Sequence, residues 1–162
     1  MAENKIMLLD GHSLLNRAYY GLPVLTNAEG KHTNAVLGFL NIMLRYMEEE
    51  RPTHLLAAFD RKEPTFRHLK YKEYKGTRKP MPEELREQVP LMKEVLSSMG
   101  IPVVTQAGIE ADDILGTIGR EAEKKDFSVV IVSGDRDLLQ LATEHTKIKI
   151  PKTRAGGTVT ED

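Results

Sequence analysis

Three short apolar runs constrain the fold of this 162-residue chain more than any other feature. They lie within residues 5–10, 53–60 and 128–135, and each is followed closely by an aspartate. None shows the strict alternation of a strand with one solvated face, so we expect strands that are buried on both faces. Two weaker apolar runs, at residues 101–105 and 147–150, predict further strands.

Helical patterns separate the predicted strands. Residues 34–50 have a broad apolar face, and residues 110–125 repeat apolar positions at helical spacing. Residues 82–100 predict a helix pair or a kinked helix, because Pro90 cannot continue the hydrogen-bond ladder. A short helix is expected after Asp137. This alternation predicts an α/β fold, with a mostly parallel central sheet and helices on both faces.

Carboxylates recur where the predicted strands end. Asp10, Asp60 and Asp135 each follow an apolar run, and Asp137 comes two residues later. In open parallel sheets, ligands bind at the carboxyl ends of the strands, so we expect these acids to meet at one edge. The segment GIEADDILG, at a predicted helix start after another strand, can face the same edge. It contributes Glu110, Asp112 and Asp113.

These acids allow two interpretations. Taken singly, Asp10 and Asp60 are turn residues, Asp112 caps a helix and Asp137 is the N-cap of the short helix that follows it. Taken together, so many carboxylates in one crevice would repel one another unless a cation neutralised them. With no cysteine and no histidine pair at ligand spacing, the fitting ion is Mg²⁺ or Mn²⁺. We favour the metal interpretation, and paired ions roughly 3.5–4 Å apart can support phosphodiester cleavage.

Residues 61–81 interrupt the strand–helix rhythm. They hold eight Lys and Arg residues against two Glu, punctuated by Pro and Gly, which predicts a loop or a mobile helical excursion above the sheet. Lys75 and Arg78 are suited to contact phosphates. The aromatic residues of the segment could stack on unpaired bases or turn to the core, and we prefer the core for Phe66 and Tyr71.

Composition excludes several classes of function. The absence of cysteine rules out disulfides, zinc–thiolate sites and thiol nucleophiles, and it suits a reducing compartment. No apolar run is long enough for a signal peptide or a membrane span, so we expect a cytoplasmic protein without a membrane partner. The net charge is only −1, but the charges are segregated. One molecule can therefore present a basic face and an acidic pocket.

Six motifs in order give the chain a close resemblance to the 5′–3′ exonuclease domain of bacterial DNA polymerase I, in the flap endonuclease family. They lie at residues 8–23, 32–43, 52–60, 65–85, 109–117 and 129–141. The resemblance implies a PIN-like, three-layer α/β/α sandwich over residues 1–162, with an arch or clamp at about 61–81.

The same resemblance implies a divalent-metal-dependent nuclease. It would act on 5′ ends and flaps of DNA, and on RNA primers, in replication and repair, with a polymerase domain in the same full-length chain. The complete family site holds two Mg²⁺ or Mn²⁺ ions. The implied metal ligands are Asp10, Asp60, Glu110, Asp112, Asp113, Asp135 and Asp137. The implied DNA-binding residues are Arg17, Arg67, Tyr74, Lys75 and Arg78, of which Lys75 and Arg78 would also offset charge that develops in catalysis.

Two departures from the family pattern leave alternatives open. The family more often has Asn at the position of His12, a change expected to matter little. The family's further D-x-x-D-N-x-P-G segment and its helix-hairpin-helix do not occur in these residues. The alternative is therefore a truncated, catalytically idle DNA-binding module without the second-metal ligands. A hydrolase of small phosphates is a third reading, but such a substrate needs no basic, aromatic arch.

Overall fold

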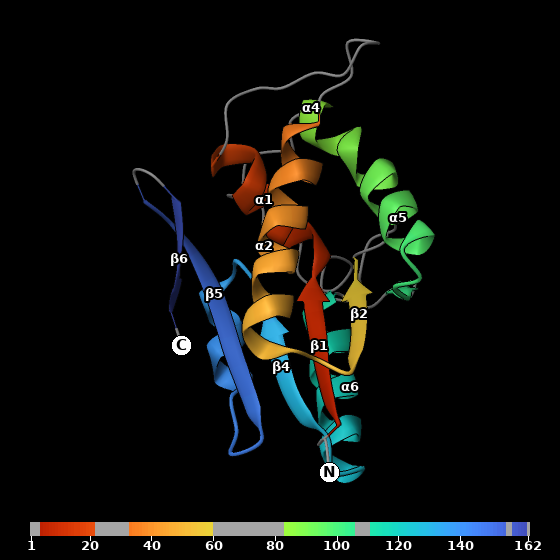
Figure 1. Cartoon of the computed structure of the whole chain (residues 1–162), viewed down its shortest axis with the longest axis vertical. Helices are drawn as coiled ribbons and strands as arrows, with labels where there is room; N and C mark the ends of the chain where they lie inside the picture. Colours follow the sequence, from red (N-terminus) through yellow and green to blue (C-terminus); the bar gives the residue numbers. More distant parts are fainter. Residues whose placement is uncertain (1–3, 22–32, 60–82, 106–110, 155–156, 162) are drawn as a thin grey trace, which may run out of the picture.

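A six-stranded sheet forms the centre of the molecule, in the order β3-β2-β1-β4-β5-β6 (Figure 1). The computed structural model describes residues 4–21, 33–59, 83–105, 111–154 and 157–161. The strands are β1 (Lys5–Asp10), β2 (His54–Ala58), β3 (Val103–Val104), β4 (Ser128–Val132), β5 (Thr146–Arg154) and β6 (Gly157–Glu161).

The sheet is parallel from β3 to β5, and only β6 runs antiparallel to its neighbour. The five predicted strands are all present, and β6 is an additional strand that pairs with β5. Strand β1 is central, with Leu9 paired to Ala57 of β2 and to Val132 of β4. Because β1 lies between two parallel partners, its backbone groups are satisfied on both sides, and Met7, Leu8 and Leu9 are buried on its two faces.

Helices cover both faces of the sheet. The described helices are α1 (Gly11–Gly21), α2 (Asn34–Glu50), α4 (Glu83–Arg86), α5 (Gln88–Ser98), α6 (Ala111–Lys124) and the 3-10 helix η1 (Arg136–Leu141). Met7 and Leu9 of β1 share a core with α1, α2 and α5, whereas Leu8 shares the opposite core with α6. The two cores follow from the two-residue period of the strand. The predicted three-layer α/β/α arrangement is confirmed.

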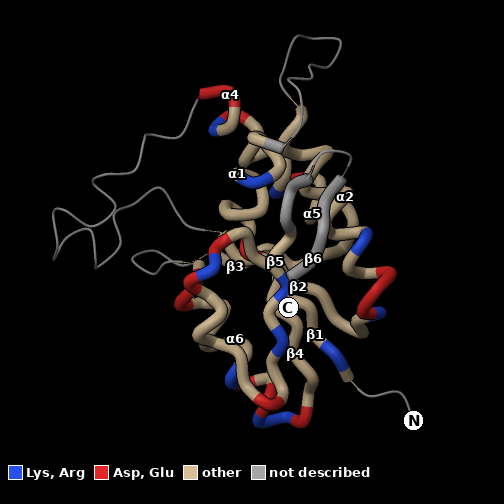
Figure 2. Tube along the Cα trace, turned by 90° about the vertical axis from the view of Figure 1, so that its left-hand side faces the viewer, with Lys and Arg blue, Asp and Glu red and all other residues tan. Residues whose placement is uncertain are grey.

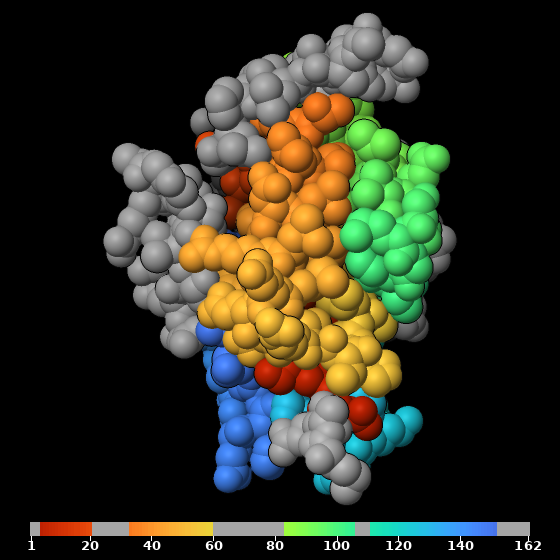
Figure 3. Space-filling view, viewed as in Figure 1, coloured from red at the N-terminus to blue at the C-terminus, as the bar shows by residue number. Residues whose placement is uncertain are grey.

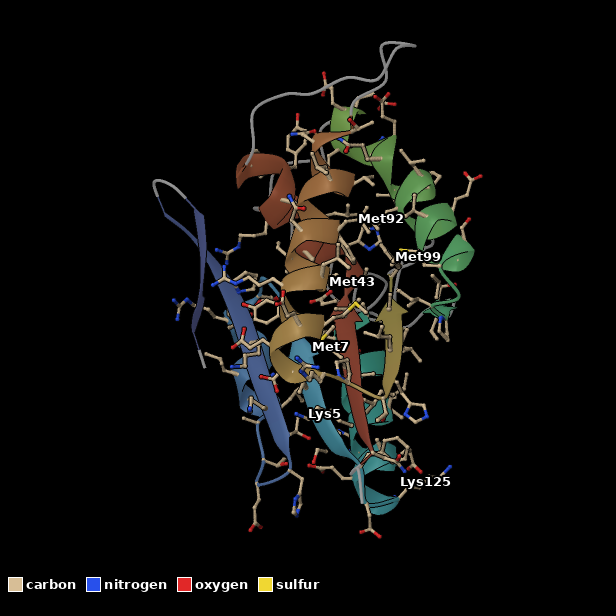
Figure 4. The ribbon with its side chains drawn as sticks, in the orientation of Figure 1. Lys5, Met7, Met43, Met92, Met99 and Lys125 are labelled. Atoms are coloured by element: carbon tan, nitrogen blue, oxygen red, sulfur yellow. The ribbon has the colours of Figure 1, made fainter. Side chains whose placement is uncertain are left out.

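Helices α2 and α5 cover one face of the sheet, where they are coloured orange and green in Figure 3. The core beneath them includes three fully buried methionines, Met7, Met43 and Met92, whose positions are labelled in Figure 4. Met47 packs against this core half-buried. No helix in the described part of the chain has the length and apolarity needed to cross a bilayer.

Two local features of the structure differ from the predictions. Helix α1 was not predicted, although its Leu14, Leu15 and Ala18 are buried at helical spacing. The break in residues 82–100 falls at Glu87 rather than at Pro90. Pro90 lies in the first turn of α5, where its missing N–H removes no hydrogen bond within that helix.

Candidate active site

The direction in which successive strands are added to the sheet reverses between the neighbouring strands β1 and β4. From β1 it moves outward to β2 and β3, and then returns past β1 to form β4 on the other side. A crevice opens outside the carboxyl ends of the strands at such a reversal, and this is where open α/β sheets bind ligands. The residues at this point are Asp10, the last residue of β1, and the segment from Ser133 to Asp137 that follows β4.

Asp10 is held by a serine that directly follows the neighbouring strand, β4. Its side chain is buried, and Oδ2 accepts a hydrogen bond of 2.7 Å from Ser133 Oγ. Ser133 is fully buried and lies 3.0 Å, Oγ to Oγ, from Ser13 in the first turn of α1. The amide of Asp135 donates to Ser133 Oγ at 2.9 Å, and that of Gly134 donates to Ser13 Oγ at 2.9 Å. Two hydroxyls thus join Asp10 to the loop that carries Asp135.

Asp135 is the N-cap of η1, since its Oδ1 accepts from the amide of Asp137 at 2.9 Å. The prediction that Asp137 would be the N-cap is therefore wrong. Asp137 lies in the first turn of η1 and is exposed, which fits the preference for acids at the positive end of a short helix. Asp135 is half-buried and faces the carboxyl edge from the end of β4.

The first turn of α6 brings two more predicted ligands to this edge. Because α6 follows β3 and leads back to β4, it begins at the carboxyl edge of the sheet. Asp112 and Asp113 are half-buried there, and Oδ2 of Asp113 is buried. Oδ1 of Asp112 accepts from the amide of Asp113 at 3.1 Å. Figure 2 shows acidic segments, in red, gathered at the end where α6 begins.

The aromatic ring of Phe59 packs tightly against the backbone next to Asp10. Phe59, the residue before Asp60, is buried with its ring edge-on to His12 at 5.3 Å between centroids. The Lys93 ammonium lies 5.4 Å from the same ring centroid. A side-chain carbon at Gly11 would come within 2.4–2.5 Å of the ring. Glycine after Asp10 is thus required for this packing.

Arg17 is the one predicted DNA-binding residue within the described part of the chain. It is half-buried on α1, and its Nη2 donates to the carbonyl of Gly134 at 3.0 Å. It therefore contacts the loop between Ser133 and Asp135 and brings a cation to the rim of the acidic edge.

The remaining predicted site residues lie outside the described residues: Asp60, Glu110, Arg67, Tyr74, Lys75 and Arg78, with Phe66 and Tyr71 among the aromatic residues. Within the described ranges, no group of three or more acidic or histidine side chains is close enough to hold a metal ion. The structure joins Asp10 and Asp135 through shared hydrogen bonds and brings Asp112 and Asp113 to the same edge by topology.

The donor set suits a hard cation. The described candidates offer only carboxylate oxygens, and serine hydroxyls support them. Mg²⁺ and Mn²⁺ prefer such oxygen ligands, and a buried carboxylate is stabilised as an anion by a cation beside it. The acids present therefore fit a divalent ion. Sequence reasoning missed Ser13 and Ser133, although both lie within motifs singled out for their aspartates.

Comparison with known proteins gives one family. Residues 5–161 match the family described as "5'-3' exonuclease, N-terminal resolvase-like domain". DNA polymerase I of Bacillus subtilis (strain 168) is 49% identical over 159 residues, which are 98% of this chain and 18% of that protein. DNA polymerase I of Bacillus caldotenax is 47% identical over 150 residues, 93% of this chain and 17% of that protein. The chain thus spans less than a fifth of the length of these relatives.

Solved structures share the fold. A T5 5'-exonuclease with bound zinc aligns with a TM-score of 0.67 at 23% identity, over 90% of this chain and 54% of that one. Human GEN1 in complex with Holliday junction DNA aligns with a TM-score of 0.58 at 12% identity, over 98% of this chain and 38% of that one. At these identities the alignments establish the fold alone.

Proposed function

Because this chain belongs to the family of 5′–3′ exonuclease N-terminal, resolvase-like domains, we propose that it cleaves phosphodiester bonds at the 5′ ends and flaps of DNA. The substrates would include RNA primers, in replication and repair, and a polymerase domain in the same full-length protein would extend the other strand. The relatives that support this proposal are DNA polymerases I.

The observation that carries the proposal is the pairing of Asp10 and Asp135 at the sheet reversal. One buried hydroxyl, Ser133 Oγ, bonds both the Asp10 carboxylate at the end of β1 and the backbone amide of Asp135 in the loop after β4, at the edge where such sheets bind ligands. Asp112 and Asp113 join them from α6. Asp60 and Glu110 complete the proposed ligand set, next to Phe59 and Ala111 in the chain.

The proposed cofactor is Mg²⁺, or Mn²⁺, with two ions in the complete site. When bound, such ions polarise a phosphoryl oxygen and lower the pKa of coordinated water. Asp10 and Asp135 would bind the ions in a fixed orientation. A T5 5'-exonuclease with bound zinc and a T5 flap endonuclease complex with DNA and metal ions support a divalent metal ion in this proposal.

Positive residues would bind the DNA. Arg17, beside the Asp135 loop, is placed to contact a phosphate at the rim. The proposed arch at 61–81 would supply Arg67, Tyr74, Lys75 and Arg78, with Lys75 and Arg78 also offsetting charge on the scissile phosphate. We propose a cytoplasmic location, which the absence of cysteine supports.

The test is cleavage of a 5′-flap DNA by the protein in its full natural length with Mg²⁺. Asp135→Asn removes the charge but keeps the oxygen that caps η1, so it should fold normally and lose at least about 100-fold in rate. Asp112→Ala should show a similar loss. Asp126→Asn is the matched control. Asp126 has φ 64°, a conformation that asparagine tolerates, so only a charge remote from the proposed site is removed.

Two outcomes would contradict the proposal. Metal-dependent cleavage that survives both Asp135→Asn and Asp112→Ala would show that the acids do not form the site. Binding of flap DNA without cleavage at any Mg²⁺ or Mn²⁺ concentration would instead support the catalytically idle binding module.

A further inference from the structure

The two serines between Asp10 and Asp135 have a defined hydrogen-bond direction. Ser133 Oγ contacts three groups: the Asp10 carboxylate, Ser13 Oγ and the amide of Asp135. An amide can only donate and a carboxylate can only accept, so the single hydroxyl proton of Ser133 goes to Asp10. Its lone pairs then accept from the amide of Asp135 and from Ser13.

Ser13 completes the chain of bonds. Its Oγ accepts from the amide of Gly134 at 2.9 Å, and its single proton is shared between Ser133 Oγ at 3.0 Å and the carbonyl of Asp10 at 3.2 Å. Two loop amides thus donate to the two hydroxyls, and the hydroxyl of Ser133 donates to the Asp10 carboxylate. A hydrogen bond to an anion is stronger than one between neutral groups, and each bond in such a chain polarises the next.

Because Ser133 is buried, the two serines can restrain the Asp10 carboxylate and the Asp135 loop. Ser133 is fully buried and Asp10 nearly so, whereas Ser13 is half-buried. Without these hydroxyls, the Asp10 carboxylate could rotate, and the Asp135 loop would lose the acceptors for two amides. Repulsion between the Asp10 and Asp135 carboxylates would then favour moving them apart whenever no cation lies between them.

We propose that Ser133, supported by Ser13, is a positioning residue for the metal site. The pair holds the Asp10 carboxylate and the Asp135 loop in their ligand arrangement before the cation arrives, so the cation does not have to order them. This inference rests on the proposed function, since it takes Asp10 and Asp135 as ligands. Supporting hydrogen bonds of this kind typically change metal affinity by about 10–100-fold.

The test is Mg²⁺ affinity measured by isothermal titration calorimetry on the full-length protein, with 5′-flap cleavage measured in parallel. Ser133→Ala should raise the Kd for Mg²⁺ by at least about 10-fold. Ser13→Ala should raise it less, because Ser13 reaches the Asp10 carboxylate only through Ser133. Ser128→Ala is the matched control and should leave the Kd unchanged, because Ser128 is the first residue of β4 whereas Ser133 follows the last.

Kinetics and melting separate positioning from simple stabilisation. Positioning predicts that Ser133→Ala lowers kcat at limiting Mg²⁺, that excess Mg²⁺ restores it and that KM for DNA is unchanged. The rise in Tm on adding Mg²⁺ should also be smaller in the variant. A purely structural role would lower Tm equally with and without Mg²⁺ and leave the Kd at its wild-type value, which would overturn the inference. If Ser133→Ala does not fold, Ser13→Ala carries the same test.

The result for the wild-type protein identifies which proposal fails. A wild-type protein that binds Mg²⁺ and cuts DNA, with unchanged Kd values in both serine variants, overturns this inference alone. A wild-type protein that binds Mg²⁺ with serine-dependent affinity but cuts no flap or 5′ end overturns the proposed nuclease and supports the positioning role. A wild-type protein that binds no Mg²⁺ overturns both.

Discussion

At the scale of single residues, the proposed site depends on the close approach of the Phe59 ring to Gly11. Gly11 follows Asp10 directly and is buried against the Phe59 ring. The ring is held from other sides by His12 and Lys93. Asp10 and the residue before Asp60 are thus fixed to each other by a single contact that only glycine permits.

Gly11→Ala should therefore destabilise the protein by about 1–3 kcal/mol, the usual cost of overpacking a core. The added carbon would lie 2.4–2.5 Å from Phe59, so the ring or α1 must move. Urea unfolding measures the change. Gly119→Ala is the matched control within α6, where the added carbon would meet Val129 at an ordinary 3.8 Å. It should be neutral, or stabilising by up to about 1 kcal/mol. Equal effects at the two positions would contradict the packing argument.

The position of Asp10 and Asp135 at one edge of the sheet could be predicted from the sequence, but the serines that join them could not. Asp10 and Asp135 follow apolar runs, and that pattern can be read one strand at a time. Ser13 and Ser133 meet across 120 positions of the chain, and a hydroxyl residue alone has no periodic signal. Only the pairing of β1 with β4 shows that their side chains touch.

At the scale of elements, α2 is capped by another helix. Its own N-cap residue, Thr33, makes no side-chain capping bond. Instead Gln88 of α5, fully buried, accepts from the amides of Ala35 at 2.8 Å and Val36 at 3.1 Å. Its amide group donates to Asn34 Oδ1 and to the carbonyl of Glu84. One side chain therefore joins α2, α4 and α5.

Gln88→Ala should lower the free energy of unfolding by about 2–3 kcal/mol, because it leaves buried amides and a buried carbonyl without partners. Gln88→Glu keeps the acceptors but places a carboxylate against Asn34 Oδ1 and the Glu84 carbonyl, so it should also destabilise the protein. Gln140→Ala, at an exposed position, is the control. Urea unfolding of the three variants measures these effects. A Gln88→Ala variant as stable as the control would refute the capping role.

Element types were more predictable than element boundaries. The strands and α2 follow from apolar runs and periodicity, which depend only on neighbouring residues. Helix α1 was missed because its few apolar positions are mixed with polar ones that face the Ser133 loop, as Ser13 and Arg17 do. The break between α4 and α5 was misplaced because Pro90 is compatible with a first helical turn, and the tertiary role of Gln88 leaves no local signature.

At the scale of the whole molecule, an ion cluster joins α2 to two strands at the end of α2. Glu50, the last residue of α2, is buried with its carboxylate 3.3 Å from Lys5 of β1 and 3.5 Å from Lys147 of β5. Lys149 of β5 is also buried, 3.6 Å from Glu50 and from Glu49. The cluster holds β5 and the first residue of β1 against the helix that covers one face of the sheet.

Glu50 should make the stability of the protein depend on pH. Burial raises the pKa of the Glu50 carboxyl, but the charges of Lys147 and Lys149, with the charge and hydrogen bond of Lys5, outweigh it and hold the pKa below its usual value. The unfolded chain, with a glutamate pKa of about 4.3, therefore takes up the proton first as pH falls. The stabilisation is fully present above that value and is lost as pH drops through the lower pKa of the folded state.

Glu50→Gln should accordingly cost about 1–3 kcal/mol at pH 7, where it leaves the buried Lys149 without the Glu50 charge. The difference from wild type should shrink as pH falls from about 4.3, since protonation removes the same charge from the wild-type protein. Urea unfolding between pH 7 and pH 3 measures both terms. Glu48→Gln, exposed on the same helix, should change neither. A Glu50→Gln penalty that stays constant across this range would show that the carboxylate acts by its shape and hydrogen bonds, and that its charge does not hold β5 to α2.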